Sequence, residues 1–201
     1  MAGGACEGPR RGCGTPELYA SLRAEAFRLA VAHADPSDRL APLCDALWEA
    51  LAGRGLSWIG FYIEDAEAQA RGAGGTGEMP PGDTASHQAA DGAMILAARR
   101  DKPACSPIGL HGVCGQGFLE ESVRLVEDVA LLGSGYIACD PRDRSEVVIP
   151  IYRNGIRWGV LDADSHERAC FGSTDIEGLT GVLRAAGLLH RDLPIRADLV
   201  G

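Results

Sequence analysis

The sequence predicts an α+β fold in which a central, mostly antiparallel sheet carries two N-terminal helices and one C-terminal helix. Three observations lead to this prediction. Two amphipathic helical stretches precede the first strand, an Asn154-Gly155 pair separates two β-rich runs, and a last amphipathic helix follows them. With 201 residues, the chain is long enough for one domain with its own core.

The two N-terminal helices have clear start signals. In Thr15-Pro16 the threonine can cap a helix and the proline suits its first position, so we expect a helix from there to about His33. Asp35-Pro36 repeats the signal. The apolar stripe of this second helix ends where Gly53 and Gly55 appear.

The first predicted strand is Ser57–Ile63, because its residues alternate. Trp58 and Tyr62 then lie on one face, and Ile59 and Phe61 lie on the other, which we expect to pack against the helices. Further short strands are predicted at Met94–Ala98 and Val123–Val129, with a brief helix after Gly115 and a long loop over Leu132–Arg144.

A β-hairpin is predicted around the turn Asn154-Gly155, with Val147–Tyr152 and Ile156–Ala163 as its strands. The last helix is expected to begin at Thr174, because Thr174 and Glu177 have the spacing of a capping box. We divide the chain into a disordered N-terminal segment (1–14), a single domain (15–190) containing a flexible Gly- and Pro-rich insertion (about 64–92), and a C-terminal tail (191–201).

The net charge of -9 repels nucleic-acid phosphates and anionic lipid, so we expect neither as a partner. No apolar stretch has the length of a membrane span, and none follows the N-terminal arginines as a signal peptide would require. A cytoplasmic protein with reduced cysteines is therefore expected, and Arg99, Arg100 and Lys102 are interpreted as a solvated turn.

Three of the seven cysteines, Cys105, Cys114 and Cys139, fall within one 35-residue window. They lack a paired Cys-x-x-Cys spacing, so we predict no metal site from them, even with His111 as a fourth ligand. Cys6, Cys13, Cys44 and Cys170 are expected to have no chemical role. The plain alternative for each cysteine is a small buried apolar residue.

Asp162 and Asp164 lie two residues apart on a predicted strand, so they share one face. In a poorly solvated site two carboxylates cannot both ionise easily, which leaves one of them available as an acid. Glu146 is harder to place. A strict two-residue hairpin sets it opposite Ala163, on the other face from the aspartates, so a bulge, a wider turn or a loop position is required if it is to join them.

Several motifs occur in a characteristic order, and together they resemble those of the free methionine-(R)-sulfoxide reductases, which are GAF-domain proteins. The resemblance runs from the first helix to Thr180. Its motifs are Ser57-Trp58-Ile59-Gly60-Phe61-Tyr62, Ala104-Cys105, Gly112-Val113-Cys114-Gly115, Val126-Glu127-Asp128-Val129, Ile137-Ala138-Cys139-Asp140, the run Arg144–Pro150 and the run Gly159–Ser165.

The resemblance implies that Cys139 attacks the sulfoxide, that Cys105 resolves the resulting sulfenic acid, and that Cys114 is an auxiliary thiol. It further implies that Glu146, Asp162 and Asp164 bind the sulfoxide end of the substrate and handle protons, and that Trp58 and Tyr62 enclose the substrate. The spacing of the three cysteines departs from the family by one residue on each side of Cys114. This departure indicates that the loop between these cysteines is rearranged.

The residues themselves fit such chemistry, because reducing a sulfoxide requires a nucleophile at sulfur and a proton for the departing oxygen. The resemblance implies no bound cofactor, free methionine-(R)-sulfoxide as substrate, thioredoxin (reduced by NADPH through thioredoxin reductase) as reductant, and a homodimer. Two alternatives stay open. The chain could be a non-catalytic GAF module that binds a small ligand or senses oxidants through its thiols, or an inactive relative that retains the fold. The plain alternative for Trp58 and Tyr62 is a role as core aromatics.

Overall fold

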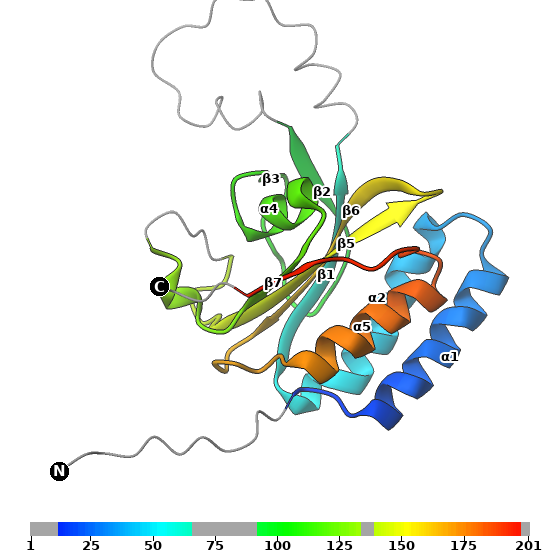
Figure 1. Ribbon diagram of the computed structural model, residues 1–201, viewed down its shortest axis with the longest axis horizontal. Helices are drawn as coiled ribbons and strands as arrows, with labels where there is room; N and C mark the ends of the chain where they lie inside the picture. Colours follow the sequence, from blue (N-terminus) through cyan, green and yellow to red (C-terminus); the bar gives the residue numbers. More distant parts are fainter. Residues whose placement is uncertain (1–11, 66–91, 134–138, 198–201) are drawn as a thin grey trace, which may run out of the picture.

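The computed structural model describes residues 12–65, 92–133 and 139–197, and its fold is the α+β arrangement predicted from the sequence (Figure 1). The predicted insertion at about 64–92 lies almost wholly outside the described residues. The elements in chain order are α1 (Pro16–Ala32), α2 (Ser37–Leu51), the 3-10 turn η1 (Ala52–Arg54), β1 (Leu56–Glu64), β2 (Ala93–Arg100), β3 (Ile108–Gly109), α4 (Val113–Glu120), β4 (Val123–Val126), the 3-10 turn η3 (Val129–Leu131), β5 (Ser145–Arg153), β6 (Ile156–Ser165), α5 (Ser173–Ala185) and β7 (Ile195–Ala197).

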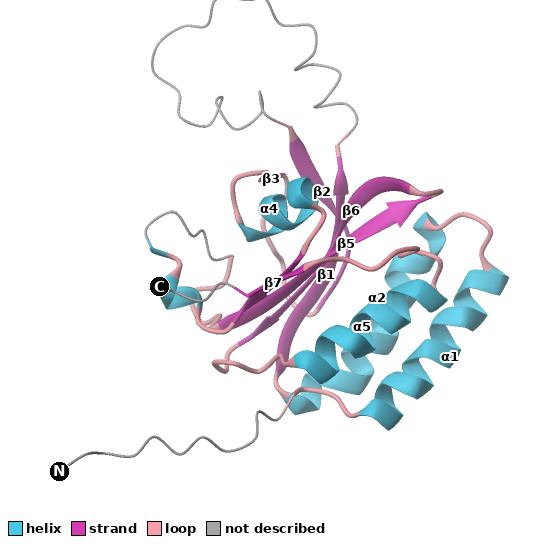
Figure 2. Ribbon diagram, viewed as in Figure 1, coloured by secondary structure: helices cyan, strands magenta, loops and turns pink. Residues whose placement is uncertain are grey.

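One sheet joins the described strands in the order β3-β2-β1-β6-β5-β4-β7. Neighbouring strands are antiparallel except β4 and β7, which are parallel. Helices α1, α2 and α5 lie together on one side of the sheet, and α4 lies on the other (Figure 2). The sheet therefore separates two compartments of unequal size.

Each face of the sheet has its own apolar cluster, and β1 contributes to both. Ile59 and Phe61 belong to the large cluster under the three long helices, whereas Trp58 and Tyr62 belong to the smaller cluster beside α4. The alternation predicted for this strand is confirmed. All four side chains are at least 98% buried, so the difference between the faces lies in their neighbours and not in burial.

Helix α1 begins as predicted, since the Thr15 hydroxyl accepts a hydrogen bond from the Leu18 amide. The start of α5 differs from the prediction by two residues. Gly172, and not Thr174, is the cap, and Asp175 accepts the Gly172 amide at 2.8 Å. Asp175 also accepts the Gly14 amide, so one buried carboxylate joins the start of α5 to the start of α1.

The hairpin turn is the predicted one, with positive φ at both Asn154 and Gly155. Beyond Tyr152↔Arg157 the next pair is Ile151↔Gly159, so Trp158 is one extra residue in β6. Of the three expected alternatives, the structure adopts the bulge, and this bulge moves Glu146 opposite Asp164.

Two terminal predictions need correction. Cys13, assigned to a disordered segment and to the reduced thiols, is buried and forms a disulfide with Cys170, because the Gly14 contact with α5 brings it to the loop before that helix. In the predicted tail, β7 pairs with β4, since Pro194 accepts the Val123 amide and continues the ladder. The strand predicted at Val123–Val129 is shorter, because η3 begins at Val129.

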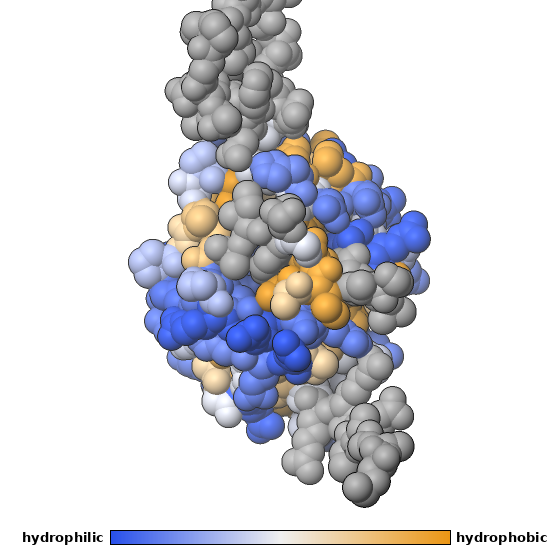
Figure 3. All heavy atoms as spheres, turned by 90° about the vertical axis from the view of Figure 1, so that its left-hand side faces the viewer, coloured by the Kyte–Doolittle hydropathy of each residue, from blue (hydrophilic) through white to orange (hydrophobic). Residues whose placement is uncertain are grey.

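The surface on the side of α4 and β7 is largely hydrophilic, with a smaller exposed apolar area near its centre (Figure 3). Large apolar side chains are exposed on elements of this side, among them Leu119, Leu131 and Ile195. Among the described residues, no helix combines the length and the apolar character needed to cross a membrane.

Candidate active site

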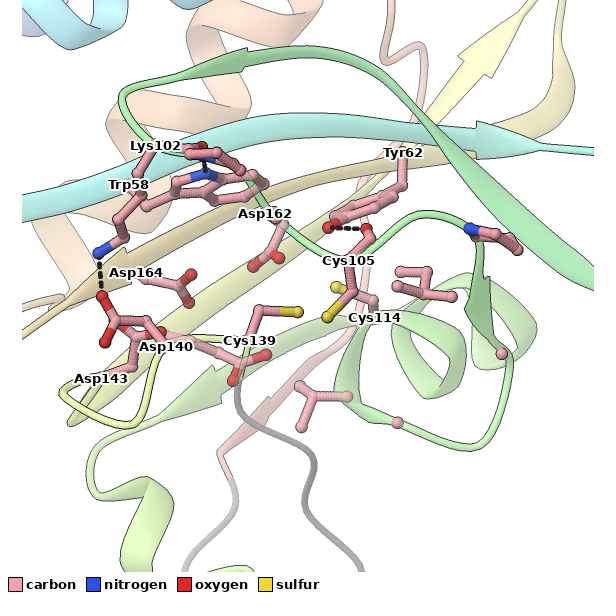
Figure 4. Close-up of a pocket in the computed structure, with 18 of the residues that line it drawn as sticks. Trp58, Tyr62, Lys102, Cys105, Cys114, Cys139, Asp140, Asp143, Asp162 and Asp164 are labelled. Atoms are coloured by element: carbon pink, nitrogen blue, oxygen red, sulfur yellow. Dashed lines mark hydrogen bonds and ion pairs between the residues drawn. The ribbon is translucent and has the colours of Figure 1, made fainter. Parts of the chain in front are cut away.

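A cavity of about 240 Å³ opens on the α4 side of the sheet. Its floor is formed by β1, β5 and β6, and its walls by the segment after β2, the first turn of α4 and the residues Cys139, Asp140 and Asp143. Every site residue predicted from the sequence lines this one cavity (Figure 4): Trp58, Tyr62, Cys105, Cys114, Cys139, Glu146, Asp162 and Asp164.

The thiols of Cys105, Cys114 and Cys139 gather at the centre of the cavity (Figure 4). Cys139 hydrogen-bonds with both the side chain and the backbone of Cys105. Each of the two residues as a whole is exposed to solvent. Burial of its sulfur atom raises the pKa of Cys139 to about 12, and the side-chain contact with Cys105 adds to the rise. At rest, Cys139 is therefore a neutral thiol in contact with a second thiol.

Cys114 differs from the other two thiols. It lies in the first turn of α4, and its pKa is raised well above the ordinary value, first by burial and then by the nearby charge of Asp162. It also hydrogen-bonds with Asp162. Because the ionised form of Cys114 is strongly disfavoured, Cys105 is the better placed partner for Cys139.

Three carboxylates lie on the cavity side of the hairpin, and the bulge at Trp158 explains why they share that side. Glu146 pairs with Asp164, and Val148 pairs with Asp162, so the three acids occupy adjacent positions of one face. Glu146 and Asp162 are 4% and 8% exposed. Such burial is unusual for acids, and it determines how they ionise.

Burial is the main cause of the altered acidity of the two aspartates. It raises the pKa of Asp162 to about 7, although the hydrogen bond from Cys114 opposes this rise. The pKa of Asp164 is raised well above its ordinary value by burial and by the charges of Asp162 and Glu146. Both shifts favour the protonated form of the carboxyl groups in the cavity.

The two aromatic residues predicted to enclose a ligand form one wall, with ring centroids 6.0 Å apart. The Trp58 indole N–H donates to the Lys102 carbonyl at 3.1 Å, and the Tyr62 hydroxyl donates to the Cys105 carbonyl at 3.0 Å. These two bonds attach the segment that carries Cys105 to strand β1 (Figure 4).

Sequence reasoning missed a polar cluster beside Cys139, which we call the lysine cluster: Lys102, Asp140, Asp143 and His166. The Lys102 ammonium contacts an Asp140 oxygen and lies 3.2 Å from His166 Nε2. Arg142 binds Asp140 through two further bonds of 2.9 and 3.1 Å. These partners hold the pKa of Asp140 well below its ordinary value.

The prediction that Lys102 belongs to a solvated turn is wrong, since it lines the cavity and its side chain is only 23% exposed. The sequence held a signal for this position. Of the 19 Lys and Arg residues, Lys102 is the only lysine, and all the others are arginines. Asp140, which directly follows Cys139, was the second available signal.

No family model matches the sequence. The chain is 31% identical over 128 residues to the GAF domain-containing protein A of Dictyostelium discoideum, which is 63% of this chain and just under two thirds (65%) of that protein. It is 29% identical over 165 residues to the free methionine-R-sulfoxide reductase of Escherichia coli, with 81% and 82% of the two chains covered.

Among solved structures, the free methionine-R-sulfoxide reductase of Neisseria meningitidis in complex with its substrate superposes with a TM-score of 0.66. The identity is 27%, and the match covers 86% of this chain and 89% of that one. The chain therefore has a GAF-like α+β fold and is similar to the free methionine-R-sulfoxide reductases.

Proposed function

We propose that this protein reduces free methionine-(R)-sulfoxide to methionine, with Cys139 as the nucleophile. The observation that carries the proposal is the contact between the Cys139 and Cys105 thiols in a cavity that also holds Asp162, whose pKa is about 7. Relatives that carry out this reaction are 29% identical over most of the chain, which supports the choice of substrate.

The first step pairs nucleophilic attack with proton transfer. An acid among Asp162, Asp164 and Glu146 donates a proton to the sulfoxide oxygen while the Cys139 sulfur attacks the sulfoxide sulfur. The thiol proton returns to the carboxylate. The oxygen ends on Cys139 as a sulfenic acid and methionine leaves as the sulfide, so the thiol has lost the two electrons that the sulfoxide has gained.

Resolution follows from the contact between the two thiols. The Cys105 sulfur attacks the Cys139 sulfenic acid, water leaves, and a disulfide forms. An external dithiol, which we propose to be thioredoxin supplied with electrons from NADPH by thioredoxin reductase, then exchanges with this disulfide and restores both thiols. Cys114 is an auxiliary thiol in this scheme.

The acidic lining and the aromatic wall suit a free amino acid. The carboxylates offer acceptors for an α-ammonium group or a protonated sulfoxide oxygen, and Trp58 and Tyr62 offer apolar surface for the S-methyl group. A peptide-bound methionine sulfoxide lacks the free α-ammonium group. We therefore expect it to be a poor substrate.

The test is NADPH consumption coupled through thioredoxin reductase and thioredoxin, with each epimer of free methionine sulfoxide and a peptide-bound form as substrates. We expect turnover of the free R epimer only, and none with Cys139→Ser. Equal rates for Cys139→Ser and the unmodified protein would contradict the mechanism. Substrate binding without turnover would favour the non-catalytic binding module instead.

A further inference from the structure

The cavity brings together a set of metal-binding groups that the spacing of the cysteines did not reveal. Cys114, Glu146 and Asp162 each offer one donor atom, and these three atoms all lie within 4.8 Å of one another. One sulfur and two carboxylate oxygens form a donor set that zinc accepts. Zinc bonds of roughly 2.0 to 2.3 Å place tetrahedral donors about 3.5 Å apart, so rotation of the side chains closes the set.

A second observation points to a cation at this place. Asp162 is 8% exposed and points toward the thiols (Figure 4), yet its Oδ1 atom has no hydrogen-bond partner among the described residues. A buried carboxylate oxygen without a partner is costly, and a bound cation supplies the missing interaction.

The charge of the cavity favours a cation as well. Five carboxylates line it, namely those of Asp140, Asp143, Glu146, Asp162 and Asp164, and the Lys102 ammonium already contacts Asp140. A divalent cation bound among these carboxylates lowers their mutual repulsion.

We propose that the reduced protein binds one Zn²⁺ ion through Cys114 Sγ and carboxylate oxygens of Glu146 and Asp162, with the fourth tetrahedral position open to the cavity. Binding releases the Cys114 proton, because the metal ligand is the thiolate. The same carboxylates are the acids of the proposed reduction. Zinc therefore competes with the sulfoxide and makes the resting enzyme sensitive to free zinc.

A second group of donors in the cavity does not compete for the ion. Asp140, Asp143 and His166 also lie within 4.8 Å of one another, but the Lys102 ammonium contacts both Asp140 and His166. A cation already occupies the centre of that group. Loss of His166 therefore serves as a matched control for the proposed site.

The test is a titration of the full-length protein, reduced and freed of reductant under nitrogen, with Co²⁺ followed by displacement with Zn²⁺. We expect one Co²⁺ per chain and a cobalt–thiolate charge-transfer band that zinc abolishes. Cys114→Ser removes the band and weakens binding at least tenfold, whereas His166→Ala retains both. Glu146→Gln, which preserves shape and all thiols, weakens binding and keeps the band.

The opposite pattern would overturn the site. If the band survives in Cys114→Ser but disappears in Cys139→Ser, or if no stoichiometric binding occurs, zinc does not bind as proposed. Because the titration measures binding and not turnover, its outcome is independent of the proposed reductase activity. A circular dichroism spectrum of each variant separates loss of ligand from loss of fold.

Discussion

Glu146 lies directly opposite Asp164 in the ladder between β5 and β6, and both line the cavity. The pairing exists because Trp158 is an extra residue in β6, without which Glu146 would face Ala163. Two carboxylates are thereby placed side by side, with Glu146 buried and Asp164 partly buried. Their repulsion contributes to the raised pKa of Asp164.

The first prediction concerns Glu146→Gln. Removing the opposing charge lowers the pKa of Asp164, so this acid loses its proton at a lower pH. We expect the alkaline limb of the profile of kcat/KM against pH to move down by on the order of one pH unit, which corresponds to about tenfold lower activity at a pH on that limb. An unchanged or upward-shifted limb would exclude Asp164 as the acid. Glu177→Gln, an exposed position on α5, is the matched control.

The second prediction concerns the pH dependence of stability through Asp162. Its pKa in the folded protein is about 7, above the value of about 3.9 for an unfolded aspartate, so the folded state binds the proton more tightly. The stability that this proton binding contributes is complete below pH 4 and is lost as the pH rises to about 7. Asp162→Asn removes this dependence, because the amide stays neutral.

Denaturant unfolding of both proteins between pH 4 and 8 measures this effect. We expect Asp162→Asn to be about as stable as the unmodified protein near pH 4 and more stable by a few kcal/mol at pH 8, while sulfoxide reduction is lost. A stability difference that does not grow with pH would show that Asp162 ionises normally.

The local parts of the fold were predictable because their signals are local. Thr15 caps α1 through a contact with the residue three positions later, and the Asn154-Gly155 turn needs only the two residues that adopt positive φ. The alternation of β1 also assigned Trp58 and Tyr62 to the correct face. The same two-residue period correctly predicted that Asp162 and Asp164 share one face of their strand.

Contacts between distant segments were not predictable. The Cys13–Cys170 disulfide joins residues 157 positions apart, and it depends on Asp175 holding the amides of Gly14 and Gly172. Lys102 was misassigned for the same reason, since its partner Asp140 is 38 positions away. A bulge was one of three alternatives predicted for placing Glu146, and the sequence indicated neither the choice among them nor the position at Trp158.

The third prediction separates the roles of the thiols. Cys139→Ser is expected to abolish reduction, because no other exposed thiol of the described residues has Cys105 as its contact. Cys105→Ser is expected to give one equivalent of methionine per chain and then stall, since Cys114 strongly resists ionisation. Cys114→Ser keeps multiple turnovers. Quantifying methionine with and without thioredoxin tests all three, and continued turnover of Cys105→Ser would make Cys114 the resolving thiol.

The fourth prediction concerns Lys102, which links the two redox segments. It lies three residues before Cys105, and its ammonium contacts Asp140, the residue after Cys139. Lys102→Met breaks this link, and we expect disulfide formation between the two thiols to slow about tenfold or more, because small displacements of reacting atoms have large kinetic effects. Stopped-flow mixing with one equivalent of sulfoxide, followed by alkylation of free thiols, measures this step.

A second measurement distinguishes positioning from general destabilisation. The charge of Lys102 lowers the pKa of Asp164, so Lys102→Met should move the alkaline limb of the pH profile upward, opposite to Glu146→Gln. Lys102→Arg keeps the charge and should leave that limb in place. Disulfide formation should still be slow in this variant, because a planar guanidinium does not reproduce the contacts of a compact ammonium with Asp140 and His166. Arg54→Met, at an exposed site, is the control and should change neither measurement. If Lys102→Arg restores the full rate, charge alone accounts for the role of this lysine.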